Sequence, residues 1–281
     1  MVLMKLLSGR ELAGFIKERQ AHQVRGLRQE HGITPKLAII VTIENPITDT
    51  YIRLKAKYGA DILAEVDIHR IRQTEVRVLL NKLNVDDKVH GIIIQLPLED
   101  PAQTEELVNL VAPEKDVDGL GAKPAFEPAT PLAILWLLAG YNIELSASKQ
   151  VLLVGRGKLV GAPLEKMLLA NGIIPAVADK YTQDLKAETL KADVVITATG
   201  HHGVLQPDML KPGAVVVDAG VASEDGKTVG DVASEIYEER DDLTITPLKG
   251  GVGPLTVCAL FDNVIRAAQR VADGAVATKQ T

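Results

Sequence analysis

The feature that most constrains the fold of this chain is an alternation of short, continuously apolar runs with amphipathic stretches. Strands that are apolar on both faces and separated by helices are typical of parallel sheets. The alternation is interrupted once, near residues 119–131, and then begins again. We therefore expect an α/β fold with two lobes, and strands at 37–43, 62–68, 91–96, 150–154, 174–178, 194–197 and 214–218.

The chain length and the interruption locate the boundary between the lobes. At roughly 150 residues per domain, 281 residues correspond to one large domain or two ordinary ones. The interrupting segment, GLGAKPAFEPATP, is rich in Gly, Pro and Ala and looks like a linker. We expect a first lobe over 1–138, a second over 139–254, and a last helix, within 255–281, that packs back onto the first lobe.

Composition narrows the class of protein. Hydrophobic residues make up 46% of the chain, enough for a buried core. The formal net charge of -6 gives no overall attraction to nucleic acid or to an anionic membrane. The first residues lack the cationic opening of a signal peptide, and no window approaches the roughly 20 apolar residues that cross a bilayer. We expect a soluble, cytoplasmic protein that binds neither nucleic acid nor membrane.

A glycine-rich turn, GRGKLVG, directly follows the apolar run VLLV. Glycines at such a strand-to-helix turn let the backbone approach a pyrophosphate, and the helix N-terminus supplies N–H donors. The spacing G-x-G-x-x-x-G is one residue longer than the usual dinucleotide fingerprint, so a turn that needs glycine only for packing is the alternative. We expect a Rossmann-like nucleotide-binding lobe, with cofactor contacts from Gly155, Arg156, Gly157, Val160 and Gly161.

The residues that follow the next strand give opposite indications about the cofactor. Asp179 lies where a carboxylate can accept a hydrogen bond from the ribose 2′-hydroxyl, which favours NAD. Lys180 and Arg156 could instead pair with a 2′-phosphate, which favours NADP. These residues alone leave the choice open. Further along the chain, Thr199 and Gly200 end a strand without a bulky side chain, which leaves room for the cofactor ribose.

We expect no metal site in this chain. Cys258 is the only cysteine, so it cannot form an internal disulfide or a thiolate zinc site. His201 and His202 are adjacent in sequence, and two neighbouring side chains of a regular element cannot both face one metal. We interpret the two histidines as surface loop residues.

Four polar residues of the first half are candidates for the chemistry. Tyr51 and Lys55 share one face of a predicted helix, and burial beside the phenol would lower the pKa of the amine and make it a usable proton acceptor. Taken alone, this pair is common on ordinary helices. Gln95 supports a catalytic role for the pair, because Gln95 ends an apolar strand at the sheet edge where open α/β sheets bind their ligands. Asp118 lies in another loop that could reach the same edge.

Taken together, these segments resemble the bifunctional methylenetetrahydrofolate dehydrogenase/cyclohydrolase (FolD-type) family. Five of them are ordered and spaced as in that family, which is far more specific than a single glycine turn. The segments that carry the resemblance are YIRLK at 51–55, GIIIQLPL at 91–98, PEKDVDG at 113–119, VGRGKLVGAP at 154–163, KPGAVVVD at 211–218 and TPLKGGVGPLT at 246–256.

The resemblance implies two reactions of one-carbon metabolism. The first oxidises 5,10-methylenetetrahydrofolate to the methenyl form with NADP or NAD, and the family slightly favours NADP. The second hydrolyses the methenyl form to 10-formyltetrahydrofolate. The resemblance also implies an N-terminal folate-binding lobe, a cofactor lobe, and a homodimer formed through the cofactor lobes. Tetrahydrofolate one-carbon derivatives would be its ligands, and no metal would be needed.

The resemblance also implies residue roles. Lys55 would be the catalytic lysine, Tyr51 its orienting partner and a stacking surface, and Gln95 its hydrogen-bonding support. Asp118 would hold the pterin ring. The remaining folate contacts would come from Leu96, Pro97, Gly250, Gly251, Val252, Gly253 and Pro254.

Some positions depart from the family pattern. Gly157 replaces a usual serine, Asp179 and Lys180 replace a usual His-Ser pair, and the loop before Ala129-Thr130-Pro131 is shortened. Two alternatives therefore stay open: a dehydrogenase without cyclohydrolase activity, and a non-catalytic nucleotide- or folate-binding protein. Retention of Lys55 and Gln95 argues against the first, and the presence of the lysine argues against the second.

Overall fold

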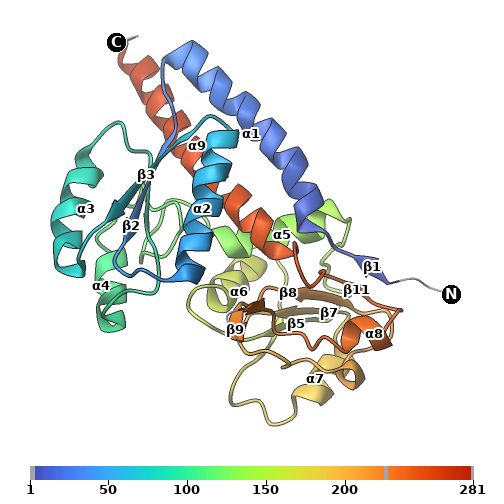
Figure 1. The fold of residues 1–281 in the computed structure, drawn as a ribbon. Helices are drawn as coiled ribbons and strands as arrows, with labels where there is room; N and C mark the ends of the chain where they lie inside the picture. Colours follow the sequence, from blue (N-terminus) through green and yellow to red (C-terminus); the bar gives the residue numbers. More distant parts are fainter. Residues whose placement is uncertain (1–3, 225–226, 280–281) are drawn as a thin grey trace. The chain divides into compact units, whose positions relative to one another are not determined.

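The chain folds into two compact units of the predicted α/β class, each built on a parallel sheet (Figure 1). The computed structural model describes residues 4–224 and 227–279. One unit, here called the six-stranded unit, contains the described residues of Met1–Ala13 and Thr130–Thr256. The other, the three-stranded unit, contains those of Gly14–Ala129 and Val257–Thr281.

The six-stranded unit is named for its main sheet, in which every described pair of neighbours is parallel. The sheet order is β1-β11-β8-β7-β5-β6. Its strands are β1 (Lys5–Leu6), β5 (Val151–Val154), β6 (Ala176–Ala178), β7 (Val194–Thr197), β8 (Val215–Asp218) and β11 (Thr244–Ile245). The other elements are the helices α5 (Ala129–Gly140), α6 (Gly161–Ala170), α7 (Leu185–Lys191) and α8 (Ile236–Glu239), and the antiparallel pair β9 (Ala222–Glu224) and β10 (Lys227–Val229).

The three-stranded unit has the parallel order β3-β2-β4, with β2 (Lys36–Val41) in the centre. In Figure 1 this sheet lies between α3 on one side and α2 on the other. Alternate residues of β2 explain the two layers, because Ala38 and Ile40 join the core cluster with the apolar side chains of α3 and α4. Its other strands and α-helices are α2 (Pro46–Asp61), β3 (Glu65–Arg70), α3 (Val76–Val85), β4 (Gly91–Ile94) and α4 (Thr104–Val108), together with most of α1 (Gly9–His31) and α9 (Val252–Lys279), whose first five residues are grouped with the six-stranded unit.

Strand β3 is shifted relative to the predicted strand at 62–68. It runs from Glu65 to Arg70 and is largely exposed. It pairs only with β2 among the described strands, so one edge of it carries no partner strand. Its acidic residues Glu65 and Asp67 lie within 2.7 and 3.5 Å of the Lys36 amine on β2. The apolar pattern misled the prediction because an edge strand is held by backbone pairing and exposed charge pairs as well as by burial.

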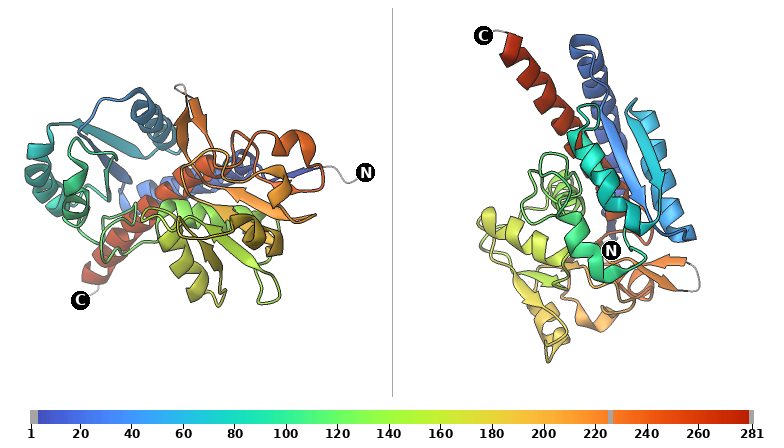
Figure 2. Two further views of the ribbon diagram at one scale, coloured as in Figure 1. Left: turned by 90° about the horizontal axis from the view of Figure 1, so that it is seen from below. Right: turned by 90° about the vertical axis from the view of Figure 1, so that its left-hand side faces the viewer.

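The last helix packs onto the three-stranded unit, as predicted. Its Phe261 ring lies 5.2 Å from the Tyr58 ring of α2, and its Asn263 donates hydrogen bonds to the carbonyls of Val117 and Glu127, both at 2.9 Å. The views in Figures 1 and 2 agree that α9 runs beside α1, where Gln20 donates a 2.9 Å hydrogen bond to the Cys258 carbonyl.

The division of the chain differs from the expected boundary at residue 138. Strand β1 and helix α5 belong to the six-stranded unit. Backbone hydrogen bonds from Lys5 to Leu243 (3.0 Å) and from Leu7 to Ile245 (2.8 Å) add β1 to the edge of that sheet. Such pairing between distant segments leaves no local signal in the sequence. In the described part of the chain, no helix is long and apolar enough to span a membrane.

Candidate active site

The glycine turn between β5 and α6 depends on two backbone approaches that only glycine permits. Gly155 has φ +98°, and a Cβ there would lie 2.6 Å from the Ala198 carbonyl oxygen. A Cβ on Gly161 would lie 2.1 Å from the Gly155 carbonyl oxygen. At Gly157, by contrast, the nearest atom would be 3.9 Å away. Packing therefore requires Gly155 and Gly161, whereas Gly157 leaves open space beside the turn, as a closely approaching ligand would need.

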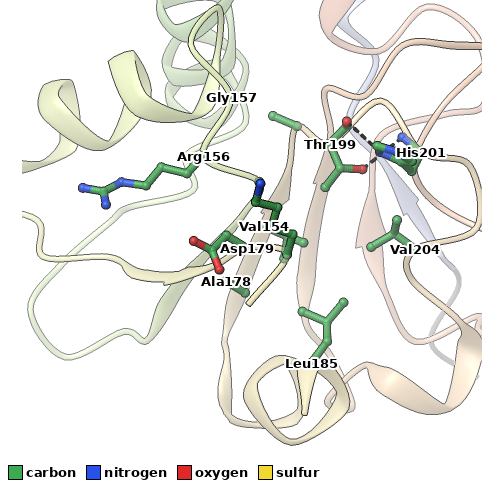
Figure 3. A pocket seen from close by; sticks show the side chains of 12 residues that line it. Val154, Arg156, Gly157, Ala178, Asp179, Leu185, Thr199, His201 and Val204 are labelled. Carbon is green, nitrogen blue, oxygen red and sulfur yellow. Dashed lines mark hydrogen bonds between the residues drawn. The ribbon is translucent and has the colours of Figure 1, made fainter. Parts of the chain in front are cut away.

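A groove with a volume of about 540 Å³ lies against this turn (Figure 3). The chain lines it with residues from the ends of β5, β6 and β7, which is the carboxyl edge where Rossmann-type sheets bind dinucleotides. Six of the predicted cofactor residues line it, and six further lining residues were not predicted as cofactor contacts. The predicted residues in the lining are Gly155, Arg156, Gly157, Asp179, Lys180 and Thr199. The other lining residues are Val154, Ala178, Leu185, Ala198, His201 and Val204.

Three predicted cofactor residues do not line the groove. Val160 and Gly161 lie at the start of α6, and Gly200 has φ +70° in the loop after β7. Any contact of theirs with a cofactor stays a prediction. The lining residues Leu185 and Val204 were missed because each is an apolar residue outside a strand, half-buried in the structure. Such residues resemble ordinary core positions in the sequence.

The loop after β7 is held by a buried carboxylate. Asp231 has no exposed surface and accepts hydrogen bonds from the backbone N–H groups of Thr199 (2.6 Å) and His201 (3.0 Å). Asp218 in turn accepts one from the Asp231 N–H at 3.0 Å. His201 is exposed, as a surface loop residue would be, but it also lines the groove beside Thr199 (Figure 3). The neighbouring His202 ring instead lies 2.8 Å from the Gly230 carbonyl oxygen.

In the three-stranded unit, the fold brings together the lysine and the glutamine that the sequence singled out. Lys55 on α2 donates a 2.8 Å hydrogen bond from Nζ to Oε1 of Gln95, which directly follows β4. The backbone N–H of Gln95 donates to Ile40 at 2.9 Å, and its side-chain Nε2 donates to the Leu96 carbonyl at 3.0 Å. These contacts fix the amide so that its oxygen faces the amine.

The two ionisable groups of this site perturb each other. Burial lowers the pKa of Lys55, and the carboxylate of Asp118 opposes that shift. Burial likewise raises the pKa of Asp118, and Lys55 opposes it. Desolvation is the larger cause for both groups, because each charge loses more hydration than its partner restores. Lys55 therefore has the electrostatic setting of a proton acceptor.

Two residues that the sequence analysis did not single out hold the loop that carries Asp118. The carboxylate of Asp116 accepts hydrogen bonds from the N–H groups of Gly119 (3.0 Å), Leu120 (3.3 Å) and Gly121 (2.8 Å). Asn263 binds the Val117 carbonyl, one residue before Asp118. The signal for Asp116 was the local D-x-D-G spacing, whereas the contact of Asn263 spans 146 residues and has no local signal.

The other predicted folate residues are divided between the units. Tyr51 lies one turn before Lys55 on α2 and is half-buried; Leu96 and Pro97 follow Gln95. The turn at 250–254 belongs mainly to the packing of the six-stranded unit, where Arg10 donates a 2.9 Å backbone hydrogen bond to Gly250. Gly250 has φ +88°, so this turn needs glycine for its backbone alone. The folate roles of these residues stay predictions.

A parallel six-stranded sheet with a glycine-built groove at its carboxyl edge, joined to a unit with a buried amine, defines the class of two-unit NAD(P)-dependent dehydrogenases. Residues 7–118 match the family model for the tetrahydrofolate dehydrogenase/cyclohydrolase catalytic domain, and residues 128–272 match that for its NAD(P)-binding domain. The chain therefore belongs to the tetrahydrofolate dehydrogenase/cyclohydrolase family.

Individual relatives agree over nearly the whole chain. The Bifunctional protein FolD of Campylobacter jejuni is 38% identical over 281 residues, which cover 95% of this chain and 99% of the relative. A crystal structure of FolD from Campylobacter jejuni has a TM-score of 0.88 at 36% identity, with 95% and 99% coverage. The Trypanosoma brucei FolD structure, complexed with NADP cofactor and inhibitor, has a TM-score of 0.88 at 29% identity, with 96% and 99% coverage.

These matches confirm the family predicted from the sequence. They also confirm the enzyme class, with dehydrogenase and cyclohydrolase functions, and NAD(P) as the cofactor. The predicted arrangement, with a catalytic domain, a nucleotide-binding domain and a returning C-terminal helix, agrees with the related structures.

Proposed function

We propose that this protein oxidises 5,10-methylenetetrahydrofolate with NAD(P) and hydrolyses the methenyl product to 10-formyltetrahydrofolate, with Lys55 as the proton acceptor. The observation that carries the proposal is the 2.8 Å hydrogen bond from Lys55 to Gln95 at a position where burial lowers the lysine pKa. The six-stranded unit would bind the nucleotide, and the three-stranded unit would supply the residues for the folate chemistry.

The residues of the groove fit a dinucleotide. The backbone at Gly155 and the open space at Gly157 would face the pyrophosphate, and the start of α6 would direct N–H groups toward it. Asp179 and Thr199 line the groove at the ends of β6 and β7, where a ribose would lie. When bound, NAD(P) supplies the acceptor for a hydride from the one-carbon bridge of the substrate.

A neutral Lys55 suits the oxidation. Loss of hydride leaves positive charge on the N–C–N unit of the folate, and an ammonium beside it would raise the barrier through like-charge repulsion. Burial lowers the pKa of Lys55 and so favours the neutral amine, which would avoid this repulsion. Gln95 accepts one of the amine hydrogens and thereby orients the nitrogen lone pair. The carboxylate of Asp118 would hold the pterin ring by accepting its N–H groups.

The same lysine would serve the hydrolysis. The oxygen of a water molecule bonds to the cationic methenyl carbon, and Lys55 Nζ accepts the proton that this water loses. The bond from the carbon to folate N5 then breaks, N5 gains a proton from the new hydroxyl, and the formyl group stays on N10. The hydride transfer releases no proton and the hydrolysis releases one, so a single buried base is sufficient.

Three further assignments belong to this proposal. Tyr51, one helical turn from Lys55, would stack on the folate and orient the amine, with Leu96, Pro97 and the turn at 250–254 as further folate contacts. We also propose that the enzyme works as a homodimer joined through its six-stranded units. Its place of action would be the cytoplasm, where one-carbon folates and the nicotinamide cofactors are both present.

An assay with two separate readings tests the proposal. The protein is mixed with methylenetetrahydrofolate and NAD or NADP, and cofactor reduction is followed at the nicotinamide absorbance; separately, the decay of supplied methenyltetrahydrofolate is followed at its own chromophore. We expect both signals to exceed the rates without enzyme. Reduction without accelerated decay would mean a dehydrogenase alone, and the absence of both would overturn the proposed function.

A further inference from the structure

We propose that Asp179 makes this enzyme prefer NAD(H) to NADP(H), because its carboxylate occupies the place that a 2′-phosphate would need. This inference rests on the proposed function of the groove as the dinucleotide site. It goes beyond the family, whose nucleotide-binding domain accepts either cofactor by its description. Three features of the groove carry it: the fixed position of Asp179, the engagement of Arg156, and the placement of Lys180.

Two local hydrogen bonds hold Asp179 at the rim of the groove. The residue directly follows β6, and the preceding carbonyl, that of Ala178, accepts a 2.8 Å hydrogen bond from the N–H of Gly155 in the glycine turn. The Asp179 N–H donates to Thr182 Oγ1 at 2.9 Å, and its Oδ1 accepts from the Tyr181 N–H at 2.9 Å. This turn fixes the carboxylate beside the turn that would hold the pyrophosphate (Figure 3).

The guanidinium of Arg156 is already paired with a carboxylate. Its Nε and Nη2 donate to Oε2 and Oε1 of Glu165 on α6 at 2.7 and 3.1 Å, a bidentate pair. Glu165 is the more buried partner, with 17% of its side chain exposed. In Figure 3 the guanidinium of Arg156 points away from the groove. Recruiting it to a 2′-phosphate would break two charge-assisted hydrogen bonds and leave the Glu165 carboxylate unpaired.

Lys180 also lines the groove, directly after Asp179. Its Nζ lies 5.0 Å from the centre of the Tyr181 ring, within the range of a cation–π contact. The neighbouring carboxylate of Asp179 would remain beside any phosphate that Lys180 bound. A phosphate carrying close to two negative charges would thus meet a fixed carboxylate, whereas a ribose 2′-hydroxyl can donate a hydrogen bond to it. The groove would therefore disfavour NADPH by repelling its 2′-phosphate and favour NADH by accepting a hydrogen bond from its 2′-hydroxyl.

Binding of the reduced cofactors, measured by calorimetry on the full chain without folate, tests this inference independently of catalysis. We expect NADH to bind on the order of tenfold or more tighter than NADPH, since a 2′-phosphate bound beside Asp179 would bring like charges close together. The variant Asp179→Asn keeps the acceptor for the Tyr181 N–H and removes the charge. It should bring the two dissociation constants at least tenfold closer together, mainly by tightening NADPH.

A matched control separates this local effect from net charge. Asp208→Asn makes the same change of one charge in the same unit, at an exposed carboxylate that pairs with Lys186 and does not line the groove. It should leave the ratio of the two constants unchanged. Adding Glu165→Gln to Asp179→Asn should release Arg156 and tighten NADPH further.

The outcomes distinguish this inference from the function on which it rests. If both reduced cofactors bind but NADPH binds as tightly as NADH or tighter, the inference is overturned and the groove keeps its proposed function. An unchanged ratio in Asp179→Asn would equally overturn it. If neither cofactor binds, the proposed function of the groove fails, and the inference fails with it.

Discussion

The nucleotide groove and the Lys55 site differ in what builds them. The nucleotide groove is built mainly by backbone: Gly155 and Gly161 let strand, turn and helix approach closely, and most of the side chains lie around its rim. Side chains build the second, through the Lys55–Gln95 hydrogen bond and the electrostatic effect of Asp118 on the pKa of Lys55. The first should therefore fail when volume is added, and the second when a charge or a donor is removed.

The largest expected effect is at the side-chain site. Lys55→Met keeps the length of the side chain and removes the proton acceptor, so hydrolysis of methenyltetrahydrofolate should fall by about 10²–10⁴-fold. Because methionine is less costly to bury than an amine, the free energy of unfolding should not decrease. Methenyl absorbance and urea denaturation measure the two quantities. Hydrolysis at the wild-type rate would show that another group accepts the proton.

The second prediction concerns the backbone site. Gly161→Ala places a Cβ where only 2.1 Å separates it from the Gly155 carbonyl oxygen. Displacement of the turn should cost about 1–3 kcal/mol of unfolding free energy and weaken NADH binding. Gly157→Ala is the control, because a Cβ there would lie 3.9 Å from the nearest atom, the Ala198 carbonyl oxygen, which is an ordinary van der Waals contact. If both variants had equal thermal stability, backbone approach would not be what distinguishes the two glycines.

A third effect, of similar size, tests how the loop of Asp118 is held. Asn263→Ala removes the donors to the carbonyls of Val117 and Glu127, both inside the three-stranded unit. We expect a loss of about 1–3 kcal/mol of unfolding free energy, together with a higher KM for folate. Denaturation and steady-state kinetics check the two parts. Unchanged stability would contradict the assigned contacts.

The smallest expected effect is a shift in pH dependence. Asp118 raises the pKa of Lys55 against the larger effect of burial, so Asp118→Asn should lower the lysine pKa further. Hydrolysis needs the neutral amine, hence kcat rises with pH as Lys55 loses its proton. In the variant this rise should occur at lower pH than in the wild type. A rise at the same or a higher pH would contradict the electrostatic coupling.

Much of both sites could be predicted because their signals are local. The run VLLV before the glycine turn, and Gln95 after the apolar β4, each indicate the end of a strand at the carboxyl edge of a sheet, where we expect ligands. His201 was correctly interpreted as a loop residue, but its place on the groove depends on Asp231, 30 residues away. The unit boundary could not be predicted because β1 joins a strand nearly 240 residues further along the chain.

The sequence by itself determined the α/β alternation and the family, and it predicted Lys55, Gln95 and Asp179 as site residues, since periodicity and residue type act over short stretches of chain. The tertiary structure alone decided the burial of the Lys55 amine and the carboxylate with which Arg156 pairs. It buries the Lys55 amine, and it ties Arg156 to Glu165. The physical reason is that desolvation and ion pairing depend on which atoms lie close together in space, and the local sequence does not specify contacts between distant segments.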